Sequence, residues 1–179
     1  PGSVGKPVSD MNMEIWNEEG RSVGPGCIGE IMAKSPRCIH NYWNNEEATK
    51  LLYTREWLHT GDLGIVDEEG YLYFIGRKKE LIKTGGENVY PLEVEQVLIK
   101  HPNIQDLAVM GIPDSEWGEK VIWFVVSKDG SNMSNTEIKQ FCQDQLSGYK
   151  IPKEVYCIEE IPRNHTGKID KLSLKTLIN

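Results

Sequence analysis

The chain lacks a long apolar run, a long basic block and a dense set of cysteines, and each absence excludes a class of protein. No stretch of its 179 residues approaches the roughly 20 apolar residues of a membrane-spanning helix, and the first residues lack the basic and apolar regions typical of a secretory signal. The net charge of −7 arises from interspersed acidic and basic residues, so we expect no nucleic-acid partner. Any polyanion bound here should be small and held by a few residues.

Four widely spaced cysteines are present, and no pair has CxxC spacing or a histidine pattern suited to a tetrahedral metal site. They are Cys27, Cys38, Cys142 and Cys157. We therefore expect a reduced, cytoplasmic protein without a metal site of this kind.

The composition, 39% apolar and 26% charged, is typical of a soluble globular protein with one ordinary domain or two small ones. Up to about residue 76, short apolar runs broken by turns predict strands at residues 13–17, 29–34 and 63–66. The turn at residues 67–70 predicts a hairpin with residues 71–75. A helix is predicted at residues 45–52, with an asparagine cap and two early glutamates.

After Arg77 the pattern changes to alternating helices and strands, which predicts a second compact unit of mixed type. Pro91 suits the first turn of a helix, and Ser134 with Glu137 forms a capping box that opens another. The predicted helices are residues 91–100, 134–146 and 171–178, and the predicted strands are residues 104–112, 121–126 and 155–158.

A polar, glycine-bearing loop at residues 162–170 presents Lys168 between two apolar segments. An ammonium group can bridge a carboxylate oxygen and a phosphate oxygen, which reduces the repulsion between two anions that must meet. A solvated surface lysine is the other interpretation, and the loop alone leaves both open. Three of the four histidines, His59, His101 and His165, show neither triad nor metal-ligand spacing.

Asp62 is the last residue of the sequence Trp-Leu-His-Thr-Gly-Asp, which begins with apolar residues. A carboxylate there can accept hydrogen bonds from the paired hydroxyls of a ribose, or it can cap a turn before the hairpin. Arg77 either serves a binding site or forms a surface ion pair with a nearby glutamate. The residues by themselves leave these alternatives open.

A charged joint at residues 76–80 leads into the glycine loop at residues 84–88 and then into the start of a helix. The two adjacent glycines lack Cβ atoms, so a thin substrate could approach the backbone closely. A hairpin turn is a compatible interpretation. The order of the two segments predicts a hinge followed by a mobile active-site loop.

Three stretches taken in order, Thr-Gly-Asp at residues 60–62, residues 76–93 and Pro-Arg-Asn-His-Thr-Gly-Lys at residues 162–168, resemble the adenylate-forming enzymes. Within that superfamily they are similar to the acyl-CoA synthetases and ligases. The resemblance spans nearly the whole chain in the right order.

This resemblance implies a role for each candidate. Lys168 is similar to the catalytic lysine of the adenylation step, Asp62 to the aspartate that holds the ribose of ATP, and Arg77 to an arginine that also reaches the nucleotide. Lys79 occupies the hinge position, where the family has Asp or Lys. The loop implied to line the channel for the pantetheine arm of CoA contains Gly85, Gly86, Glu87 and Asn88.

Two further motifs of the family have no counterpart here: its phosphate-gripping loop and its aromatic-glycine-x-threonine-glutamate motif. Most of the acyl pocket is also missing. We therefore expect the carboxy-terminal portion of a ligase with an α+β fold. Residues 1–76 are the β-rich end of the large domain, and residues 77–179 are a small, mobile, mixed α/β lid domain. The portion alone is expected to be inactive.

The implied parent activity is that of a carboxylic acid:CoA ligase that acts on a fatty or aryl acid through an acyl adenylate. ATP, CoA and the acid are the implied small-molecule partners, and Mg²⁺ is the implied metal, without identifiable ligands in these residues. Two alternatives stay open: an adenylation enzyme that loads a carrier protein, and a noncatalytic binding module. The sequence carries no signal for an oligomeric state.

Overall fold

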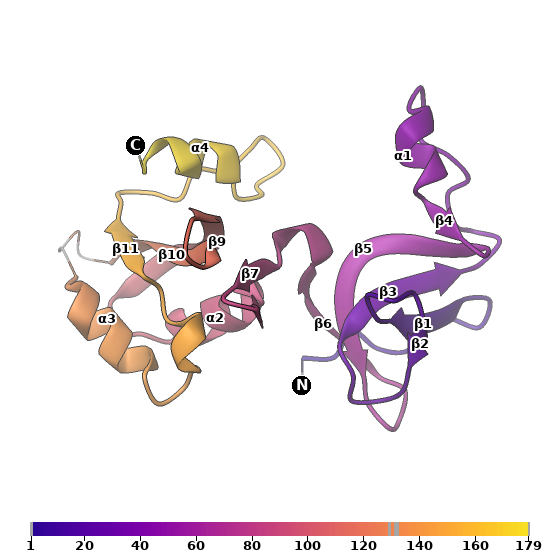
Figure 1. Ribbon diagram of the computed structural model, residues 1–179, viewed down its shortest axis with the longest axis horizontal. Helices are drawn as coiled ribbons and strands as arrows, with labels where there is room; N and C mark the ends of the chain where they lie inside the picture. Colours follow the sequence, from indigo (N-terminus) through magenta and orange to yellow (C-terminus); the bar gives the residue numbers. More distant parts are fainter. Residues whose placement is uncertain (1, 129, 131–132, 179) are drawn as a thin grey trace. The chain divides into compact units, whose positions relative to one another are not determined.

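The computed structural model describes residues 2–128, 130 and 133–178, and the chain forms two compact units (Figure 1). These are Pro1–Lys79 and Glu80–Asn179. Strands dominate and helices are few and short, which confirms the expected fold class. The functional division expected after residue 76, with a mobile second domain, stays a prediction.

The first unit is a six-stranded antiparallel sheet in the order β2-β1-β3-β5-β4, with β6 also paired to β5. Its strands are β1 Asn12–Trp16, β2 Ser22–Val23, β3 Gly29–Lys34, β4 Tyr53–Thr54, β5 Trp57–Val66 and β6 Leu72–Arg77. The long, curved β5 carries three neighbours, because β4 and β6 share one of its edges. A stretch of β5 between those two partners is therefore left without a ladder on that edge.

One short helix, α1 Glu46–Lys50, interrupts these strands. The Asn45 side chain accepts a hydrogen bond from the Ala48 N–H at 3.0 Å, so the predicted asparagine cap is confirmed. The helix is shorter than the predicted residues 45–52. Nearby Trp43 is 97% exposed and Leu51 78% exposed.

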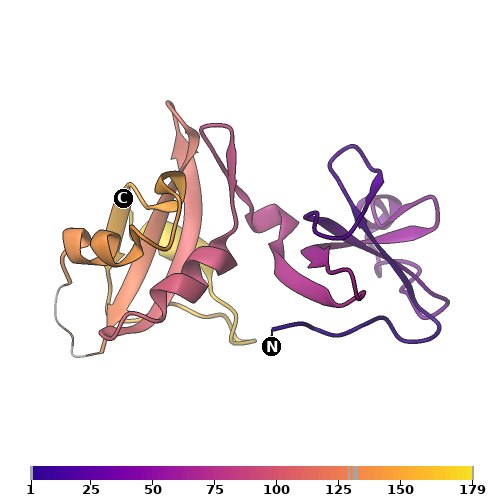
Figure 2. The same cartoon turned by 90° about the horizontal axis from the view of Figure 1, so that it is seen from below.

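The second unit is built on a five-stranded sheet in the order β11-β10-β7-β8, with β9 also paired to β10. The short helix η1 Lys78–Glu80 spans the division between the two units. The elements of the second unit are β7 Ile82–Thr84, β8 Glu87–Val89, α2 Pro91–Leu98, β9 Ile104–Asp114, β10 Gly118–Ser127, α3 Asn135–Cys142, η2 Gly148–Lys150, β11 Glu154–Cys157 and α4 Lys171–Thr176. The long β9 and β10 strands run through the middle of this unit (Figure 2).

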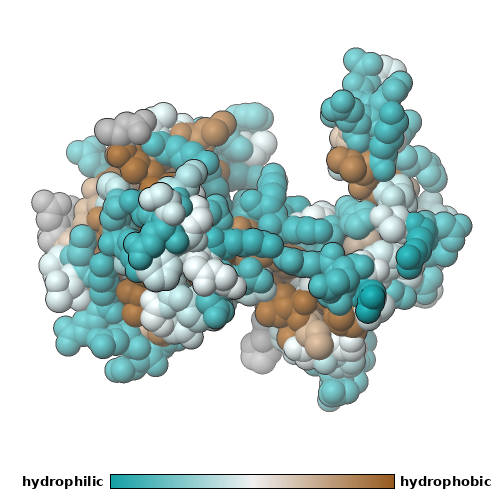
Figure 3. Space-filling view, in the orientation of Figure 1, coloured by the Kyte–Doolittle hydropathy of each residue, from teal (hydrophilic) through white to brown (hydrophobic). Residues whose placement is uncertain are grey.

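Alternate residues of β9 and β10 face two separate cores, as the two-residue period of a strand dictates. One core receives Val109 and Trp123 and is covered by α2 and α3. The other receives Met110 and Phe124 and is covered by α4 through Leu174. Helices therefore cover both faces of the sheet, and hydrophilic residues dominate the surface seen in Figure 3.

Several predicted bounds were wrong, and two short strands were missed. The strand predicted at residues 63–66 begins six residues earlier, at Trp57, because the polar residues 59–62 remain within the strand. The helix predicted at residues 134–146 ends at Cys142, although Ser134 caps it by accepting from the Glu137 N–H at 3.1 Å. The two-residue strands β2 and β4 were not predicted. Among the described residues, no helix has the length and apolar character needed to cross a membrane.

Candidate functional site

The Thr-Gly-Asp sequence lies in a bulge of β5. Opposite Ile31 of β3 stand three residues of β5, namely Thr60, Gly61 and Asp62. Gly61 has a φ of 72°, a conformation that residues with a side chain rarely adopt. The bulge re-aims the Asp62 side chain, and the glycine in the motif makes this local geometry possible.

Three hydrogen bonds replace the ladder bonds that the bulge removes. The Thr60 hydroxyl donates to the Ile31 carbonyl at 2.7 Å, and the Asp62 N–H donates to the same hydroxyl oxygen at 3.1 Å. The Gly61 N–H donates to Oε1 of Glu30 at 3.2 Å. Backbone groups removed from a sheet must find such partners, and here side chains provide them.

Asp62 lies directly across the sheet from Arg77, the last residue of β6. Oδ1 of Asp62 is 2.8 Å from Nη1 of Arg77, but the contact is not aligned as a hydrogen bond, and Oδ1 is buried without such a bond among the described residues. The Asp62 side chain is 27% exposed, so a ligand can reach part of it. The alternative that Arg77 pairs with a glutamate is wrong, because its partner is Asp62.

The pKa of Asp62 lies above its ordinary value. Burial is the largest cause, the neighbouring Arg77 acts in the opposite direction, and the negative charge of Glu30 raises the pKa further. The guanidinium therefore favours the ionised form of a partly covered carboxylate.

Lys79 lies in η1 and is exposed. Its two neighbours each form an ion pair within their own unit. Lys78 Nζ is 2.8 Å from Oε2 of Glu30 in the first unit, and Glu80 Oε2 is 3.3 Å from Nζ of Lys171 in the second. A change of backbone angles at Lys79 would leave both ion pairs intact.

Residues 84–88 form the tip of the β7–β8 hairpin, in which Thr84 pairs with Glu87. Gly85 and Gly86 have φ values of 58° and 85°, as a two-residue turn with positive φ at both positions requires. The Gly85 N–H donates to the Trp117 carbonyl at 2.9 Å, and a Cβ on Gly85 would lie 2.7 Å from Cε3 of Trp117. Space at this tip therefore depends on glycine.

The loop that carries Lys168 is organised around the side chain of Asn164. Its Oδ1 accepts hydrogen bonds from the Thr166 N–H at 2.9 Å, the Thr166 hydroxyl at 2.7 Å and the Lys168 N–H at 3.1 Å. Gly167 has a φ of 81° and donates its N–H to the Asn164 carbonyl at 2.9 Å. The turn is closed by local bonds, so its shape does not depend on the lysine side chain.

Arg163 fastens this loop to the sheet of the second unit. Its Nη2 is 2.7 Å from Oδ2 of Asp106 on β9, and its Nη1 donates to the Gly167 carbonyl at 3.3 Å. Lys168 itself is exposed, and its ammonium group has no ion pair or hydrogen bond with the part of the chain that the structure describes. A held loop thus presents an uncommitted cation.

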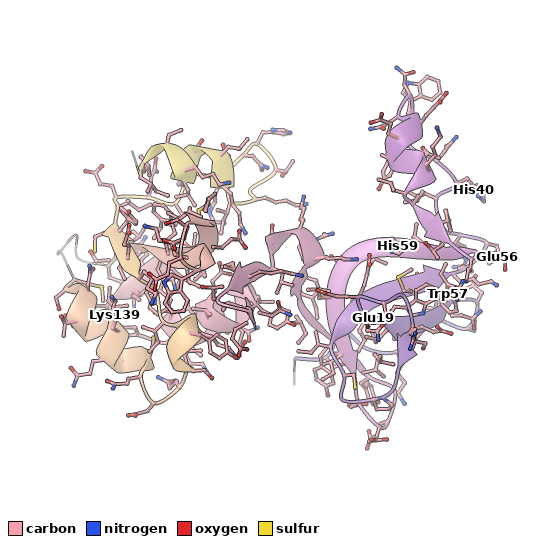
Figure 4. The ribbon with its side chains drawn as sticks, in the orientation of Figure 1. Glu19, His40, Glu56, Trp57, His59 and Lys139 are labelled. Carbon is pink, nitrogen blue, oxygen red and sulfur yellow. The ribbon has the colours of Figure 1, made fainter. Side chains whose placement is uncertain are left out.

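Of the predicted site residues, the structure brings Asp62 and Arg77 into contact in the first unit. The hairpin and Lys168 belong to the second unit. Sequence reasoning missed Glu30, His59 and Lys78, which lie beside the bulge (His59 is labelled in Figure 4). A charged residue within the apolar strand at residues 29–34 was the available signal for Glu30.

No group of three or more His, Cys, Asp or Glu side chains in residues 2–128, 130 and 133–178 is placed to hold a metal ion. The described residues therefore form no metal cage of three or more such side chains.

Comparison with known proteins places these features in a family. The family described as "AMP-binding enzyme C-terminal domain" matches residues 93–168. A 2-succinylbenzoate–CoA ligase of Bacillus cereus is 42% identical over 177 residues, which cover 99% of this chain and 36% of that protein. An oxalate–CoA ligase of Arabidopsis thaliana is 40% identical over 171 residues, covering 96% of this chain and 33% of that protein.

A solved structure of o-succinylbenzoate CoA synthetase from Bacillus subtilis, in complex with its acyl-adenylate intermediate, superposes with a TM-score of 0.89. It is 38% identical, and the match covers 97% of this chain and 35% of that one. The chain thus spans about a third of the length of these relatives. It belongs to the adenylate-forming, AMP-binding superfamily and corresponds to a carboxy-terminal portion of that superfamily's CoA ligases.

Proposed function

We propose that this chain is the carboxy-terminal part of an ATP-dependent, AMP-forming acid–CoA ligase. The observation that carries the proposal is the Lys168 loop, which is fixed by Asn164 and Arg163 yet leaves the lysine ammonium exposed and uncommitted. A loop built in this way suits a cation that must meet a substrate. The reaction belongs to the full-length enzyme, since the related ligases are about three times longer than this chain.

In the first half-reaction, a carboxylate oxygen of the acid attacks the α-phosphorus of ATP. A bond from that oxygen to phosphorus forms, the bond between the α- and β-phosphates breaks, and pyrophosphate leaves with its electron pair. Lys168 would lie between the two anions and reduce their repulsion, and its positive charge would offset the negative charge on the α-phosphate oxygens in the transition state. Among the described residues no carboxylate pairs with the ammonium, which supports this role.

Asp62 and Arg77 would hold the nucleotide during this step. The partly exposed carboxylate can accept hydrogen bonds from ribose hydroxyls, and the adjacent guanidinium favours its ionised form against the effect of burial. The buried Oδ1 without an aligned hydrogen bond fits a carboxylate whose bonding is incomplete until a ligand arrives.

In the second half-reaction, the CoA sulfur attacks the acyl carbon, the bond to the adenylate oxygen breaks, AMP leaves and the thiol proton passes to solvent. The Gly85–Gly86 turn would line the passage of the pantetheine arm, with Glu87 and Asn88 exposed beside it. Lys79 would be the hinge between the two reactions. Its exposed side chain and the separate ion pairs on its two sides support that role.

Magnesium, when bound to the nucleotide, would neutralise phosphate charge in an enzyme of this chemistry, and no group of three or more His, Cys, Asp or Glu among the described residues is placed to hold it. The acids named in the relatives are 2-succinylbenzoate and oxalate. We therefore propose an aryl or short acid as the first substrate to assay, with a fatty acid beside it.

The test uses the full-length enzyme that contains this chain. We expect acid-dependent exchange of pyrophosphate into ATP, followed by acyl transfer to free CoA. Transfer to a phosphopantetheinylated carrier protein but not to CoA would favour the carrier-loading alternative, and absence of exchange with a broad panel of acids would favour a noncatalytic module. The 179-residue chain alone is expected to give no exchange.

A further inference from the structure

Glu30 is a buried carboxylate at the centre of a polar network in the first unit. Glu30 is 6% exposed, and it is the one acidic residue among the buried residues described. Oε1 accepts from the Gly61 N–H at 3.2 Å, while Oε2 lies 2.8 Å from Nζ of Lys78 and 3.1 Å from Nδ1 of His59. One side chain thus contacts β5 at two points and η1 at a third.

The contact with Gly61 fixes the bulge from which Asp62 projects. A glycine with positive φ is the least constrained residue in the bulge, so its N–H needs a partner to hold one conformation. Glu30 Oε1 is that partner. The position of the Asp62 carboxylate, one residue further on, therefore depends on the Glu30 side chain.

The contact with Lys78 fixes Arg77, the other residue of the Asp62–Arg77 pair. Lys78 follows Arg77 directly, so an ion pair at Lys78 holds the end of β6 from which the guanidinium extends. Burial acts to raise the pKa of Glu30, but the hydrogen bonds and charges of Lys78 and His59 outweigh it, and the pKa lies below its ordinary value. The carboxylate is therefore ionised at neutral pH and can hold the lysine.

His59 extends the network along β5. Its second ring nitrogen, Nε2, lies 2.9 Å from Oγ1 of Thr54 on β4. The network therefore reaches β4 through Thr54, and it reaches η1, directly after β6, through Lys78. No part of it contacts the Asp62 carboxylate directly through a hydrogen bond.

We propose that Glu30 is a positioning residue that sets Asp62 and Arg77 in register for the nucleotide. The inference rests on the proposed function, because it concerns the same nucleotide site. A purely stabilising buried ion pair is the competing account, since such pairs often serve the fold alone. The two accounts differ in what happens to ATP binding once the protein is folded.

The experiment compares Glu30→Gln with Glu56→Gln in the full-length enzyme. Glu56 also pairs with a lysine of the first unit, at 2.7 Å from Lys34, but it is exposed and away from the bulge (Figure 4). We expect Glu30→Gln to raise KM for ATP about tenfold, while kcat at saturating ATP and KM for the acid stay within about twofold. Glu56→Gln should leave all three unchanged.

A second pair of variants covers the case in which Glu30→Gln does not fold. Lys78→Gln changes a side chain that is 54% exposed, and Lys34→Gln is its control at 43%. Lys78→Gln is expected to raise KM for ATP about fivefold. The double variant Glu30→Gln with Lys78→Gln should be no worse than Glu30→Gln alone, because both remove the same contact.

Hydrogen exchange of backbone amides gives a readout that needs no activity. Exchange at residues 60–62 and 77–78 should be about tenfold faster in Glu30→Gln than in Glu56→Gln. Equal KM for ATP in Glu30→Gln and Glu56→Gln, with only a lower melting temperature in the former, would overturn the inference. Loss of the proposed function itself would show in the unaltered enzyme, which would then have no ATP-dependent reaction, so the two failures are distinguishable.

Discussion

Asp62 and Lys168 are both charged side chains on polar segments that contain a glycine, yet their surroundings differ. Asp62 is half-buried, faces Arg77 at 2.8 Å and projects from a bulge that Glu30 and Thr60 hold. Lys168 is exposed, and its ammonium has no partner among the described residues, although its backbone is held by Asn164. The first is positioned together with its counter-ion, and the second is held only at the backbone.

This difference fits the two tasks in the proposed reaction. A nucleotide that stays bound through both half-reactions requires a site of constant shape, and a buried network provides one. A lysine needed in only one half-reaction must be able to leave, and each strong local ion pair would compete with its use. The contrast predicts that changes at the two sites affect different kinetic steps.

The largest effect is expected at Lys168. Lys168→Ala in the full-length enzyme should slow formation of the acyl adenylate by about 100-fold or more, because a cation at the developing charge is lost. Transfer from a supplied acyl adenylate to CoA should remain within about twofold. Pre-steady-state assays of the two half-reactions measure this separation.

Lys175→Ala is the matched control, because Lys175 is also exposed and lies only seven residues away, in the last turn of α4. It should leave both half-reactions unchanged. Equal slowing of both half-reactions by Lys168→Ala would break the comparison, since it would mean that the loop acts throughout the cycle.

The next effect is expected at Asp62. Asp62→Asn keeps the shape of the side chain but removes its charge, so we expect KM for ATP to rise about 10- to 100-fold, as for lost hydrogen bonds to a charged group. Asp10→Asn removes another Asp–Arg pair of the same unit, at 2.6 Å from Arg37, and should leave KM unchanged. If neither variant changed KM for ATP, the pair of Asp62 and Arg77 would be an ordinary surface ion pair.

Local signals in the sequence predicted most elements of the fold. The Ser134 cap, the proline at the start of α2 and the apolar runs of β9 and β10 each act within a few residues, and the structure contains all of them. Helix ends were harder to predict. The amphipathic pattern continues beyond Cys142, but the helix ends there, so periodicity alone overestimated its length.

The candidate site shows the same division between local and distant information. The Gly85–Gly86 turn follows from its own residues, since two adjacent glycines satisfy a turn with positive φ at both positions. The Glu30 network does not follow from neighbouring residues. Along the chain, Glu30 is 29 residues from His59 and 48 residues from Lys78, and they meet only through the register of β3 and β5. Pairing register is a tertiary property that no local pattern contains.

A smaller, opposite effect is expected at the hairpin. Gly85→Ala places a Cβ 2.7 Å from Cε3 of Trp117 and forces a positive φ on alanine, so the tip must shift. Transfer to CoA should slow about fivefold to tenfold, with adenylate formation within about twofold, the reverse of Lys168→Ala. Gly20→Ala imposes a similar φ, 71° against 58°, in open space and should change neither step. Slower adenylate formation in Gly85→Ala would remove the hairpin from the second half-reaction.

The smallest effect is a pH dependence of stability that separates Glu30 from Asp62. The pKa of Glu30 is lowered on folding, because Lys78 and His59 outweigh burial, so its contribution is present above its ordinary value of 4.5 and is lost as pH falls through the lowered pKa. The raised pKa of Asp62, caused mainly by burial, gives a contribution of opposite sign, which is present below 3.8 and lost as pH rises.

Urea unfolding of the 179-residue chain between pH 7 and pH 3 checks this sign. Glu30→Gln should lower the free energy of unfolding by about 2 kcal/mol at pH 7. The difference from the unaltered chain should shrink as pH falls below 4.5, because Glu30 is protonated first in the unfolded state and then, at its lowered pKa, in the folded state. Asp62→Asn should show no such loss at acid pH, because its carboxylate contributes least where it is ionised. A Glu30→Gln difference that stays constant with pH would assign the effect to packing of the side chain, and the bulge would then be held by shape and not by charge.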